Sequence, residues 1–463
     1  MQRPSYHIFR FVTGVVYRAS RRFTGPGVYV LSFAVVAGAI GVDTTQSVAY
    51  QAFGLLFALM VVSALCLPFL RARVDVEREL PRIATAGQPF VYRARVTNPG
   101  NGALDGLCLY EDLADPRPAH EVYRTAIGFP TYRAWKRLVD ASEIARVAER
   151  PVPALPPGTT VEIEVQAHAL KRGIVHSRGV TVGRADPLGL LRALSSLPRQ
   201  ANLVVLPRRY PLPPFTLPGS RRYQQGGVAL AASVGDSEEF VGLRDYRPGD
   251  PLQRIHWKSF ARAAKPVVRE YQNEYFERHA LALDTFARPG DERRFEEAVS
   301  IAASFVYTIE TQECLLDLMF IGARAYSHTG GRGQLSPASL LEILAGVQPC
   351  REHKFPALAE AVLARRQALS GCICVLLDWD EPRRELARML RAQGIALRVV
   401  VVTDQPVDER PPWLLVVEPG RVAEGLAGMQ SRYRTPYHDH DGEHERSMAA
   451  GRSTVAPARA LHE

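Results

Sequence analysis

Hydrophobic and polar positions follow three different patterns along the chain. Two long apolar runs lie near the N-terminus, at 28–42 and 48–70, and the second is long enough to cross the ~30 Å of hydrocarbon in a bilayer. The first reaches the ~20 residues that a crossing requires only if 23–27 is added. Strand-like segments follow, and these give way to strands that alternate with helices. We therefore expect a two-helix transmembrane hairpin at 23–70, followed by two domains outside the membrane.

The charges around the apolar runs predict how the hairpin is oriented. Arginines flank it on both sides, within a basic segment at 1–22 and again from 71 onward, whereas the link at 43–47 contains no Lys or Arg. Because positive residues are retained on the cytoplasmic side, we expect an inner-membrane protein with both termini and its other domains in the cytoplasm. A cleavable signal peptide is disfavoured, since no small-residue cleavage pattern precedes a soluble stretch. The alternative is a pair of helices buried in a protein core.

The segment 74–206 has the pattern of β-structure. Residues 90–97 and 160–166 alternate between apolar and polar, and a further strand is expected at 202–207. We interpret the segment as an antiparallel β-sandwich. The stretch near 115–150 interrupts the pattern with helix-favouring Ala, Arg and Glu, so we treat it as a helical insertion to which the sequence assigns no role.

Strands and helices alternate in the second half of the chain. The expected strands are 280–284, 315–321, 372–377, 396–402 and 414–417, and the expected helices are 292–310, 337–345, 356–368 and 382–392. This order predicts an α/β domain at 220–427, with a parallel sheet and helices on both faces. A proline-rich linker at 207–219 precedes the domain, and the polar segment 428–463 after it is expected to be disordered.

Turn-forming and charged residues are densest at 236–271. Pro248-Gly249 signals a turn, because proline presets φ and glycine accepts the positive φ of a type II turn. Asp250 before Pro251 predicts an N-cap carboxylate followed by proline at the first helical position. We therefore expect a short helix from Pro251 to about Arg262.

That helix would carry a basic stripe, because three cations recur every four residues along it. These cations are Arg254, Lys258 and Arg262. Trp257 would lie beside the stripe and stabilise the fold by burying its indole, while Leu252 and Ile255 would point toward a core. The balance of acidic and basic side chains also suits an internal network, so a structural latch and a partner-binding surface both remain open.

The wording of this segment is E-F-x-G-L-R-x-Y-x-P-G-D, followed by I-H-W-K-x-x-A-R and V-R-E. It resembles the signature of the bacterial family called domain of unknown function 58, and Lys171-Arg172-Gly173 and Asp186-Pro-Leu-Gly-Leu190 also look like that family's wording. The resemblance implies a membrane-anchored protein with a von Willebrand factor type A-like domain, often associated with a MoxR-type AAA+ ATPase. It implies no known reaction. The signature residues, expected to be structural or binding, are Glu239, Gly242, Arg244, Tyr246, Pro248, Gly249, Asp250, Arg254, His256, Trp257, Lys258, Arg262, Arg269 and Glu270.

A von Willebrand type A domain binds Mg²⁺ when its first strand ends in D-x-S-x-S, which supplies one carboxylate and two hydroxyl oxygens. The corresponding residues here begin at Asp284, with Phe286 and Arg288 in the two hydroxyl positions. A guanidinium would repel a cation, so we expect a degenerate site with no metal and no other cofactor. Asp378 is either a second acidic position of such a domain or a helix cap. A loose metal site in the tail is the alternative, at His438, His440 and His444.

Composition narrows the functional classes. The 463 residues include 57 Lys and Arg against 48 Asp and Glu, and the net charge of +9 favours an anionic membrane surface or an acidic partner. The chain has no G-x-x-x-x-G-K-[ST], H-E-x-x-H or G-x-S-x-G motif, which disfavours nucleotide hydrolysis and two common hydrolase mechanisms. Its cysteines lack paired spacing apart from Cys372 and Cys374, which indicates a reducing compartment. Those two would be small buried residues on one face of a strand.

We therefore predict a membrane-anchored protein-interaction module, not an enzyme, that serves the assembly or maturation of envelope complexes. Its expected partners are the membrane, a MoxR-type ATPase and unidentified client proteins, and nucleic acid is disfavoured. Two other hypotheses remain. A hydrolase would use His256 with Asp250 or a neighbouring carboxylate, and would need a cleft that converges on the imidazole. A nucleic-acid-binding protein would use the basic stripe and would lose affinity steeply with salt.

Overall fold

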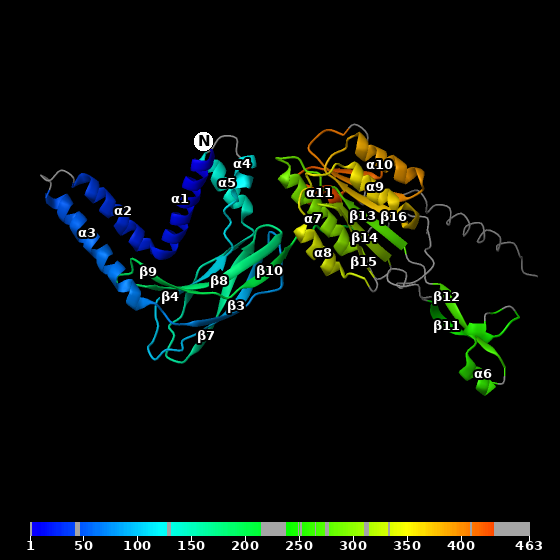
Figure 1. Cartoon of the computed structure of the whole chain (residues 1–463), viewed down its shortest axis with the longest axis horizontal. Coiled ribbons are helices and arrows are strands. Elements are labelled where there is room, and N and C mark those ends of the chain that lie inside the picture. The colour runs from blue at the N-terminus through cyan, green and yellow to red at the C-terminus, as the bar shows by residue number, and fades with distance from the viewer. Residues whose placement is uncertain are drawn as a thin grey trace, which may run out of the picture. The chain divides into compact units, whose positions relative to one another are not determined.

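The computed structural model describes residues 2–41, 47–126, 131–213, 238–248, 250, 252–263, 265–273, 277–309, 314–331, 334–407 and 410–429. These residues form two compact units, one made mainly of Met1–Arg208 and the other beginning at Arg209. Figure 1 labels the helices and strands of both. Residues 214–219 of the expected linker and 430–463 of the segment expected to be disordered lie outside the described ranges.

Three helices begin the first unit, α1 Gln2–Arg22, α2 Gly25–Ile40 and α3 Ser47–Cys66, and α3 continues as the 3-10 turn Leu67–Leu70. The segment Val48–Leu70 is long and apolar enough to cross a membrane, and only 6% of its most apolar part is buried, so it is not a core helix. α2 is apolar but shorter, and it packs against α3. The pair is compatible with a membrane anchor. The expected link at 43–47 lies almost wholly outside the described residues.

The expected helical insertion is present, and it has a structural role. It consists of α4 His120–Ala126 and α5 Tyr132–Ser142. Both pack against α1, a helix that the sequence analysis did not expect in the basic segment 1–22. Tyr6 of α1 lies in a buried aromatic cluster with Tyr123 and Trp135. The insertion therefore supplies the surface on which the N-terminal helix is held.

The bend between α1 and α2 is fixed to the body of the first unit at Thr24. Its side-chain oxygen caps α2 by accepting a hydrogen bond from the Gly27 amide at 3.1 Å, and its own amide donates to the Leu190 carbonyl at 3.1 Å. A Cβ at Gly27 would lie 1.9 Å from that same carbonyl oxygen. Only glycine therefore allows α2 to start this close to the Leu190 backbone.

Asp186 shapes the turn that presents the Leu190 carbonyl. Its buried carboxylate accepts hydrogen bonds from the amides of Leu190 and Leu191, each at 2.7 Å, and from Leu188 at 3.2 Å. Burial by itself opposes ionisation of Asp186, but these amides outweigh it and hold the pKa of the carboxyl below its usual value. The Asp186–Leu190 motif noted in the sequence therefore forms the turn against which the bend between α1 and α2 packs.

Two β-sheets form the body of the first unit. One has the order β1 Asp75–Glu79, β3 Pro89–Thr97, β7 Thr160–Ala169 and β5 Ala145–Val147; the other has the order β2 Ile83–Thr85, β10 Ala201–Leu206, β8 Gly173–Ala185, β4 Leu107–Leu113 and β6 Arg150–Val152, with β9 Arg192–Leu197 beside β8. Alternate side chains of both sheets share one hydrophobic core, as a sandwich requires. The strands expected at 90–97, 160–166 and 202–207 are present. Neighbouring strands are antiparallel except β2 and β10, which the sequence analysis did not foresee.

The second unit is built on a six-stranded sheet in the order β15, β14, β13, β16, β17 and β18. The strands are β13 Glu277–Leu283, β14 Cys314–Ile321, β15 Ala325–Gly330, β16 Gly371–Leu376, β17 Ala396–Val402 and β18 Leu414–Val417. All neighbours are parallel except β15, which runs antiparallel to β14. The expectation of a wholly parallel sheet is wrong at this edge, because the connection 322–324 is too short for a crossover and forms a hairpin.

Helices cover both faces of this sheet, as expected (Figure 1). They are α7 Glu292–Thr308, α8 Pro337–Gly346, α9 Pro356–Ala364, α10 Glu381–Ala392 and α11 Val422–Ala427. α9 and α10 share a hydrophobic core with one face of the sheet, whereas α7 contacts β13 and β16 without contributing to that core and so covers the other face. Cys372 and Cys374 are buried on one face of β16, with their Sγ atoms 3.7 Å apart, and all six cysteines are free.

The close contact between the α1–α2 bend and the Leu190 backbone can be tested at Gly27. We expect Gly27→Ala to lower the melting temperature of the detergent-solubilised full-length chain, because the new Cβ must displace the Leu190 backbone, at a cost of about 1–3 kcal/mol. Gly25→Ala is the matched control, since nothing lies within 4 Å of a Cβ there. Equal melting temperatures for the two variants would contradict the close approach.

Candidate functional site

The structure brings the two halves of the signature together in a β-ribbon. β11 Glu238–Asp245 pairs antiparallel with β12 Val267–Asn273, so that Gly242 lies opposite Glu270 and Leu243 opposite Arg269. The register shifts between Phe240 and Gly242, which marks a bulge in β11. Some predicted residues cannot be placed in full: Gly249 and Pro251 lie outside the described residues, as do the side chains of Glu239, Arg254, Arg269 and Glu270.

Asp250 is not the N-cap that the sequence predicted. Its carboxylate forms a bidentate ion pair with Arg244, with both N···O distances at 2.7 Å, and accepts a further hydrogen bond from the Arg247 amide at 2.9 Å. The hydrogen bonds from Arg244, followed by that from the Arg247 amide, lower the pKa of Asp250 to about 2. Asp250 therefore ties the turn after β11 back to the strand, and we call this pair the latch.

The predicted helix from Pro251 to Arg262 is interrupted. A 3-10 turn spans Leu252–Arg254, Ile255 makes an isolated bridge with Val268, and the His256 amide donates to the Val267 carbonyl at 2.8 Å. The α-helix α6 begins only at Trp257 and ends at Ala263. Pairing with β12 thus takes the backbone of residues 255 and 256 out of the helix. The prediction of a basic stripe of three cations is wrong for the same reason, since Arg254 does not share a helical face with Lys258.

The side chains around α6 differ from expectation in burial as well. Ile255 is buried, as predicted, but Leu252 and Trp257 are 66% and 63% exposed. Trp257 packs edge-to-face on Phe260 with ring centroids 6.0 Å apart. Lys258 and Arg262 are exposed beside these rings, and within the described ranges neither forms an ion pair. We call Trp257, Lys258, Phe260 and Arg262 the α6 surface.

His256 is not arranged for acid–base chemistry with Asp250. The Nδ1 atom of His256 lies 2.6 Å from the Ser259 hydroxyl, three residues along the same turn. The Asp250 carboxylate is instead occupied by Arg244 and Arg247. His256 and Asp250 therefore do not form the catalytic pair that one version of the hydrolase hypothesis used.

An arginine from α10 occupies the position at which a von Willebrand type A domain would bind its metal. Asp284, directly after β13, is fully buried, and its carboxylate accepts from Arg383 Nε at 2.7 Å, from the Leu377 amide at 3.1 Å and from the Phe286 amide at 3.0 Å. Arg383 is itself buried, and its guanidinium lies 4.6 Å from the centre of the Phe355 ring.

This arrangement removes the oxygen ligands that Mg²⁺ would need. Burial alone would lower the pKa of Arg383, but Asp284 and then Asp380, which lies 2.7 Å from Nη1, raise it, so the guanidinium stays charged. The Thr285 hydroxyl donates to the Ile321 carbonyl at 2.6 Å. The sequence analysis named Arg288 as the repelling cation, but Arg288 is 77% exposed and lies near Asp378, at 3.6 Å. The buried cation is Arg383, and the residues present do not fit a metal.

No group of three or more metal-binding side chains gathers anywhere in the part of the chain that the structure describes. The tail histidines His438, His440 and His444 lie outside that part.

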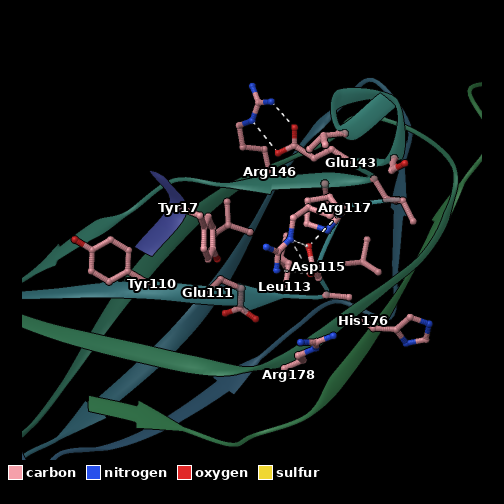
Figure 2. Close-up of a pocket in the computed structure, with 18 of the residues that line it drawn as sticks. Tyr17, Tyr110, Glu111, Leu113, Asp115, Arg117, Glu143, Arg146, His176 and Arg178 are labelled. Atoms are coloured by element: carbon pink, nitrogen blue, oxygen red, sulfur yellow. Dashed lines mark hydrogen bonds and ion pairs between the residues drawn. The ribbon is translucent and has the colours of Figure 1, made fainter. Parts of the chain in front are cut away.

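A cavity of about 770 Å³ lies in the first unit, between α1 and strands of the sandwich (Figure 2). Its lining carboxylates are already paired: Asp115 with Arg117, with Nη2 and Oδ2 2.6 Å apart, and Glu143 with Arg146. No signature residue lines it. No local sequence pattern predicts this cavity, because its walls come from four separate segments within 13–21, 110–117, 139–149 and 174–178.

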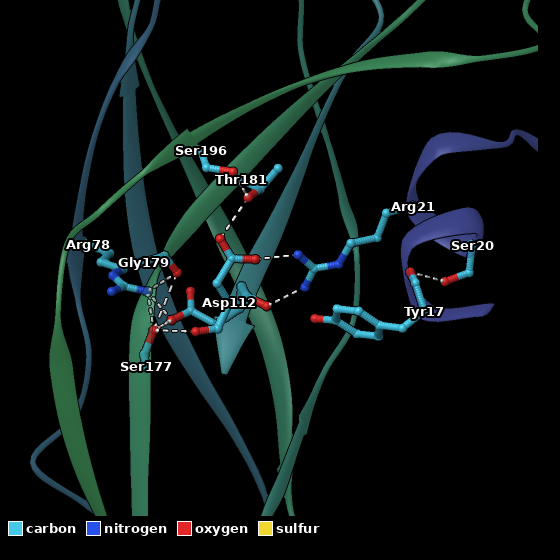
Figure 3. Close-up of polar contacts among 10 residues, drawn as sticks. Tyr17, Ser20, Arg21, Arg78, Asp112, Ser177, Gly179, Thr181 and Ser196 are labelled. Carbon is cyan, nitrogen blue, oxygen red and sulfur yellow. Dashed lines mark hydrogen bonds and ion pairs between the residues drawn. The ribbon is translucent and has the colours of Figure 1, made fainter. Parts of the chain in front are cut away.

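A buried polar network joins α1 to the two sheets (Figure 3), and two of its members, Arg21 and Glu111, also line the cavity. Glu111 of β4 is paired with Arg78 and accepts a hydrogen bond from the Tyr92 hydroxyl of the facing sheet at 2.9 Å. Burial, and then Glu111, raise the pKa of Tyr92, so its hydroxyl stays protonated. Arg21 of α1 pairs with Asp112 and donates to the Glu111 carbonyl at 2.9 Å. The polar groups here are used to hold the fold.

Comparison with known proteins assigns the second unit. Residues 242–418 match the family model described as protein of unknown function DUF58. This segment therefore resembles the DUF58 family. A curated relative, the uncharacterized protein YeaD of Bacillus subtilis (strain 168), is 27% identical over 140 residues. The match covers 30% of this chain and 33% of YeaD, so it spans about a third of that relative.

Solved structures add no argument about this protein. The CARDB domain of PF1109 from Pyrococcus furiosus is 9% identical, with a TM-score of 0.16, and the match covers 28% of this chain and 93% of that domain. The alpha-2-macroglobulin of E. coli is 14% identical, with a TM-score of 0.17, over 34% of this chain and 9% of the other. Similarities of this size do not define a shared fold.

The ion pair between Asp284 and Arg383 can be tested by removing its cation. We expect Arg383→Met to destabilise the full-length chain by about 3–5 kcal/mol in thermal or chemical unfolding, because it leaves the Asp284 carboxylate buried and unpaired. Arg388→Met is the control on the same helix, since Arg388 is 60% exposed and surface ion pairs contribute about 0–1 kcal/mol. The double variant Asp284→Asn/Arg383→Met should recover part of the loss. If Arg383→Met melts like the control, the carboxylate has another partner.

The latch predicts a specific pH dependence. Because the pKa of Asp250 is lower in the folded chain than in the unfolded one, its contribution to stability is present above pH ~3.9 and is lost as the pH falls toward about 2. We expect ¹³C NMR of the carboxyl carbon to titrate near pH 2. Arg244→Gln should move that midpoint toward ~3.9. An unchanged midpoint in the variant would show that Arg244 does not hold the carboxylate.

Proposed function

We propose that this protein is a membrane-anchored, non-enzymatic interaction module that serves the assembly or maturation of envelope complexes. The observation that carries the proposal is the α6 surface, where a largely exposed tryptophan stands beside two cations that have no ion-pair partner among the described residues. Exposed aromatic residues with neighbouring cations are typical of binding hot spots, because they bury a large area when a partner covers them. The latch supports this assignment, since it satisfies the neighbouring charges internally and leaves α6 to face outward.

We interpret the second unit as a von Willebrand type A-like domain that does not use a metal. A carboxylate directly after the first strand of the sheet, and helices on both faces, support that interpretation. With Arg383 on the Asp284 carboxylate, a partner has no exposed metal to coordinate. Recognition is therefore assigned to side chains, and the α6 surface is the best candidate among those described.

The partner that we propose is acidic, because Lys258 and Arg262 present uncompensated positive charge. A MoxR-type AAA+ ATPase is the candidate, and the resemblance of the signature is the reason for naming it. Nucleic acid remains disfavoured, since the interrupted helix leaves only two of the three cations of the proposed stripe on α6.

The anchor that we propose is a two-pass hairpin of α2 and α3 in the inner membrane. The length and apolarity of Val48–Leu70 support it, together with the shorter apolar helix beside it. We infer a cytoplasmic location for both termini and both units from the arginines that flank the hairpin, under the positive-inside rule.

The experiment compares partner capture with stability in the full-length chain. Trp257→Ala, Lys258→Glu and Arg262→Glu should each reduce crosslinking to the ATPase in native membranes, by about tenfold or more for Trp257→Ala, with melting temperatures within ~1 °C of wild type since these side chains are exposed. Lys354→Glu is the control, as an exposed lysine elsewhere in the same unit. Undiminished capture by all three variants would refute the surface. A drop in melting temperature as large as the drop in capture would make it part of the latch instead.

A further inference from the structure

Helix α1 has one face fixed to the protein. Tyr6 is buried against Tyr123 and Trp135, and the Trp135 indole donates to the Thr13 hydroxyl at 2.8 Å. Farther along the same face, Arg21 is held by Asp112. Positions 6, 13 and 21 are spaced by about two turns each, so the contacts run along most of the helix. α1 is therefore a rigid part of the first unit.

The opposite face of α1 is apolar and exposed. Its side chains are Ile8, 57% exposed, Phe11, 72%, Val12, 39%, Val15, 45%, and Val16, 56%. They occur at positions i, i+3, i+4, i+7 and i+8, the spacing of one continuous helical stripe. We call these five residues the α1 stripe. A contiguous apolar surface of this kind is rare on a soluble protein without a partner.

The position of the stripe indicates what covers it. Figure 1 shows α1 and the α2–α3 hairpin diverging from the bend between α1 and α2, with α4 and α5 on the side of α1 away from the hairpin. Because the stripe lies opposite the face that packs on α4 and α5, it turns toward the side on which the apolar hairpin extends. A bilayer that receives the hairpin would therefore meet the stripe as well.

Charge at the end of α1 nearest the hairpin fits the same partner. Arg18 and Arg22 follow Val15 by three and seven residues, which places them along the stripe at its C-terminal end. Both are exposed, and among the residues described neither forms an ion pair or hydrogen bond. Guanidinium groups that lie next to an apolar stripe can bind the phosphates of anionic lipids while the stripe contacts the acyl chains.

We propose that α1 is an interfacial helix that lies on the lipid surface of the membrane entered by the hairpin. The α1 stripe occupies the boundary between headgroups and acyl chains, and Arg18 and Arg22 bind lipid phosphates. Because the other face of α1 is fixed to the sandwich, this contact sets the orientation of the first unit on the membrane. The inference rests on the proposed membrane anchor, and it assigns to α1 a partner that the hairpin alone does not require.

Photocrosslinking from three positions tests the proposal in the full-length chain. Benzoylphenylalanine replaces Phe11 in the stripe, Tyr29 in α2, or Tyr132, which is 45% exposed on α5. The chain is reconstituted in vesicles of phosphatidylethanolamine and phosphatidylglycerol, and lipid adducts are counted by mass spectrometry. We expect adducts from positions 11 and 29, and at least tenfold fewer from position 132.

The outcomes separate the stripe from the anchor. Adducts from position 29 without adducts from position 11 would overturn the stripe while the anchor stands, and none from either would overturn both. Protein adducts from position 11 would mean that a second copy, or the hairpin folded onto α1, covers the stripe, and the proposal would fail. A second variant tests the charges: Arg18→Gln/Arg22→Gln should lower the position-11 lipid yield severalfold in these vesicles but not in phosphatidylcholine. An equal yield in both would remove the phosphate contact from the proposal.

Discussion

The first unit depends on how one carboxylate arranges one turn. Asp186 gathers three amides of the residues that follow it, and this fixes the Leu190 carbonyl where Thr24 and Gly27 meet it. The bend between α1 and α2 therefore has a set position on the sandwich. Both the apolar hairpin and the N-terminal helix leave from that point, so their starting geometry follows from a few hydrogen bonds to a buried anion.

The second unit solves a similar electrostatic problem by another route. A carboxylate at the end of the first strand of the sheet is buried, and such a charge requires compensation. Many sites of this kind would use a cation from solvent. Here Arg383 supplies the charge from within the chain, stacked on Phe355 and shared with Asp380. Because the guanidinium belongs to the chain, the Asp284 carboxylate is neutralised without a metal ion.

The sequence predicted most of the regular elements of the α/β sheet, because its buried strands read as continuous apolar runs between helices of ordinary length. It predicted the helical insertion but not its use. α1 was missed because its arginines drew attention to charge, although the spacing from Ile8 to Val16 was visible in the sequence. The helix at Pro251 failed since Asp250 bonds to Arg244 rather than to the helix amides, and β12 pairs with the segment that should have continued it.

The ion pair at the position of the expected degenerate metal site was harder to predict from the sequence, for a physical reason. Asp284 and Arg383 are separated by 99 residues in the sequence, and no local pattern connects them. The basic residue near Asp284 in the sequence, Arg288, was therefore taken for the one that matters. Only the folding of α10 against the end of β13 decides which guanidinium reaches the carboxylate.

The arginines of both units divide into two groups with different consequences. Arg21, Arg244 and Arg383 have carboxylate partners in the chain, and their charge is used to hold α1, the β-ribbon and the end of the sheet. Cations of the second group, such as Arg22 and Arg262, are exposed and unpaired within the described residues. A paired cation gains little from a new anion, because the first partner must be released, whereas an unpaired one loses only water. The positive charge that is available to a new anion therefore lies with the second group, beside the α1 stripe and on the α6 surface. Of the described parts of the chain, these are the places where the proposed partners, anionic lipids and an acidic protein, would compete least with ion pairs of the fold.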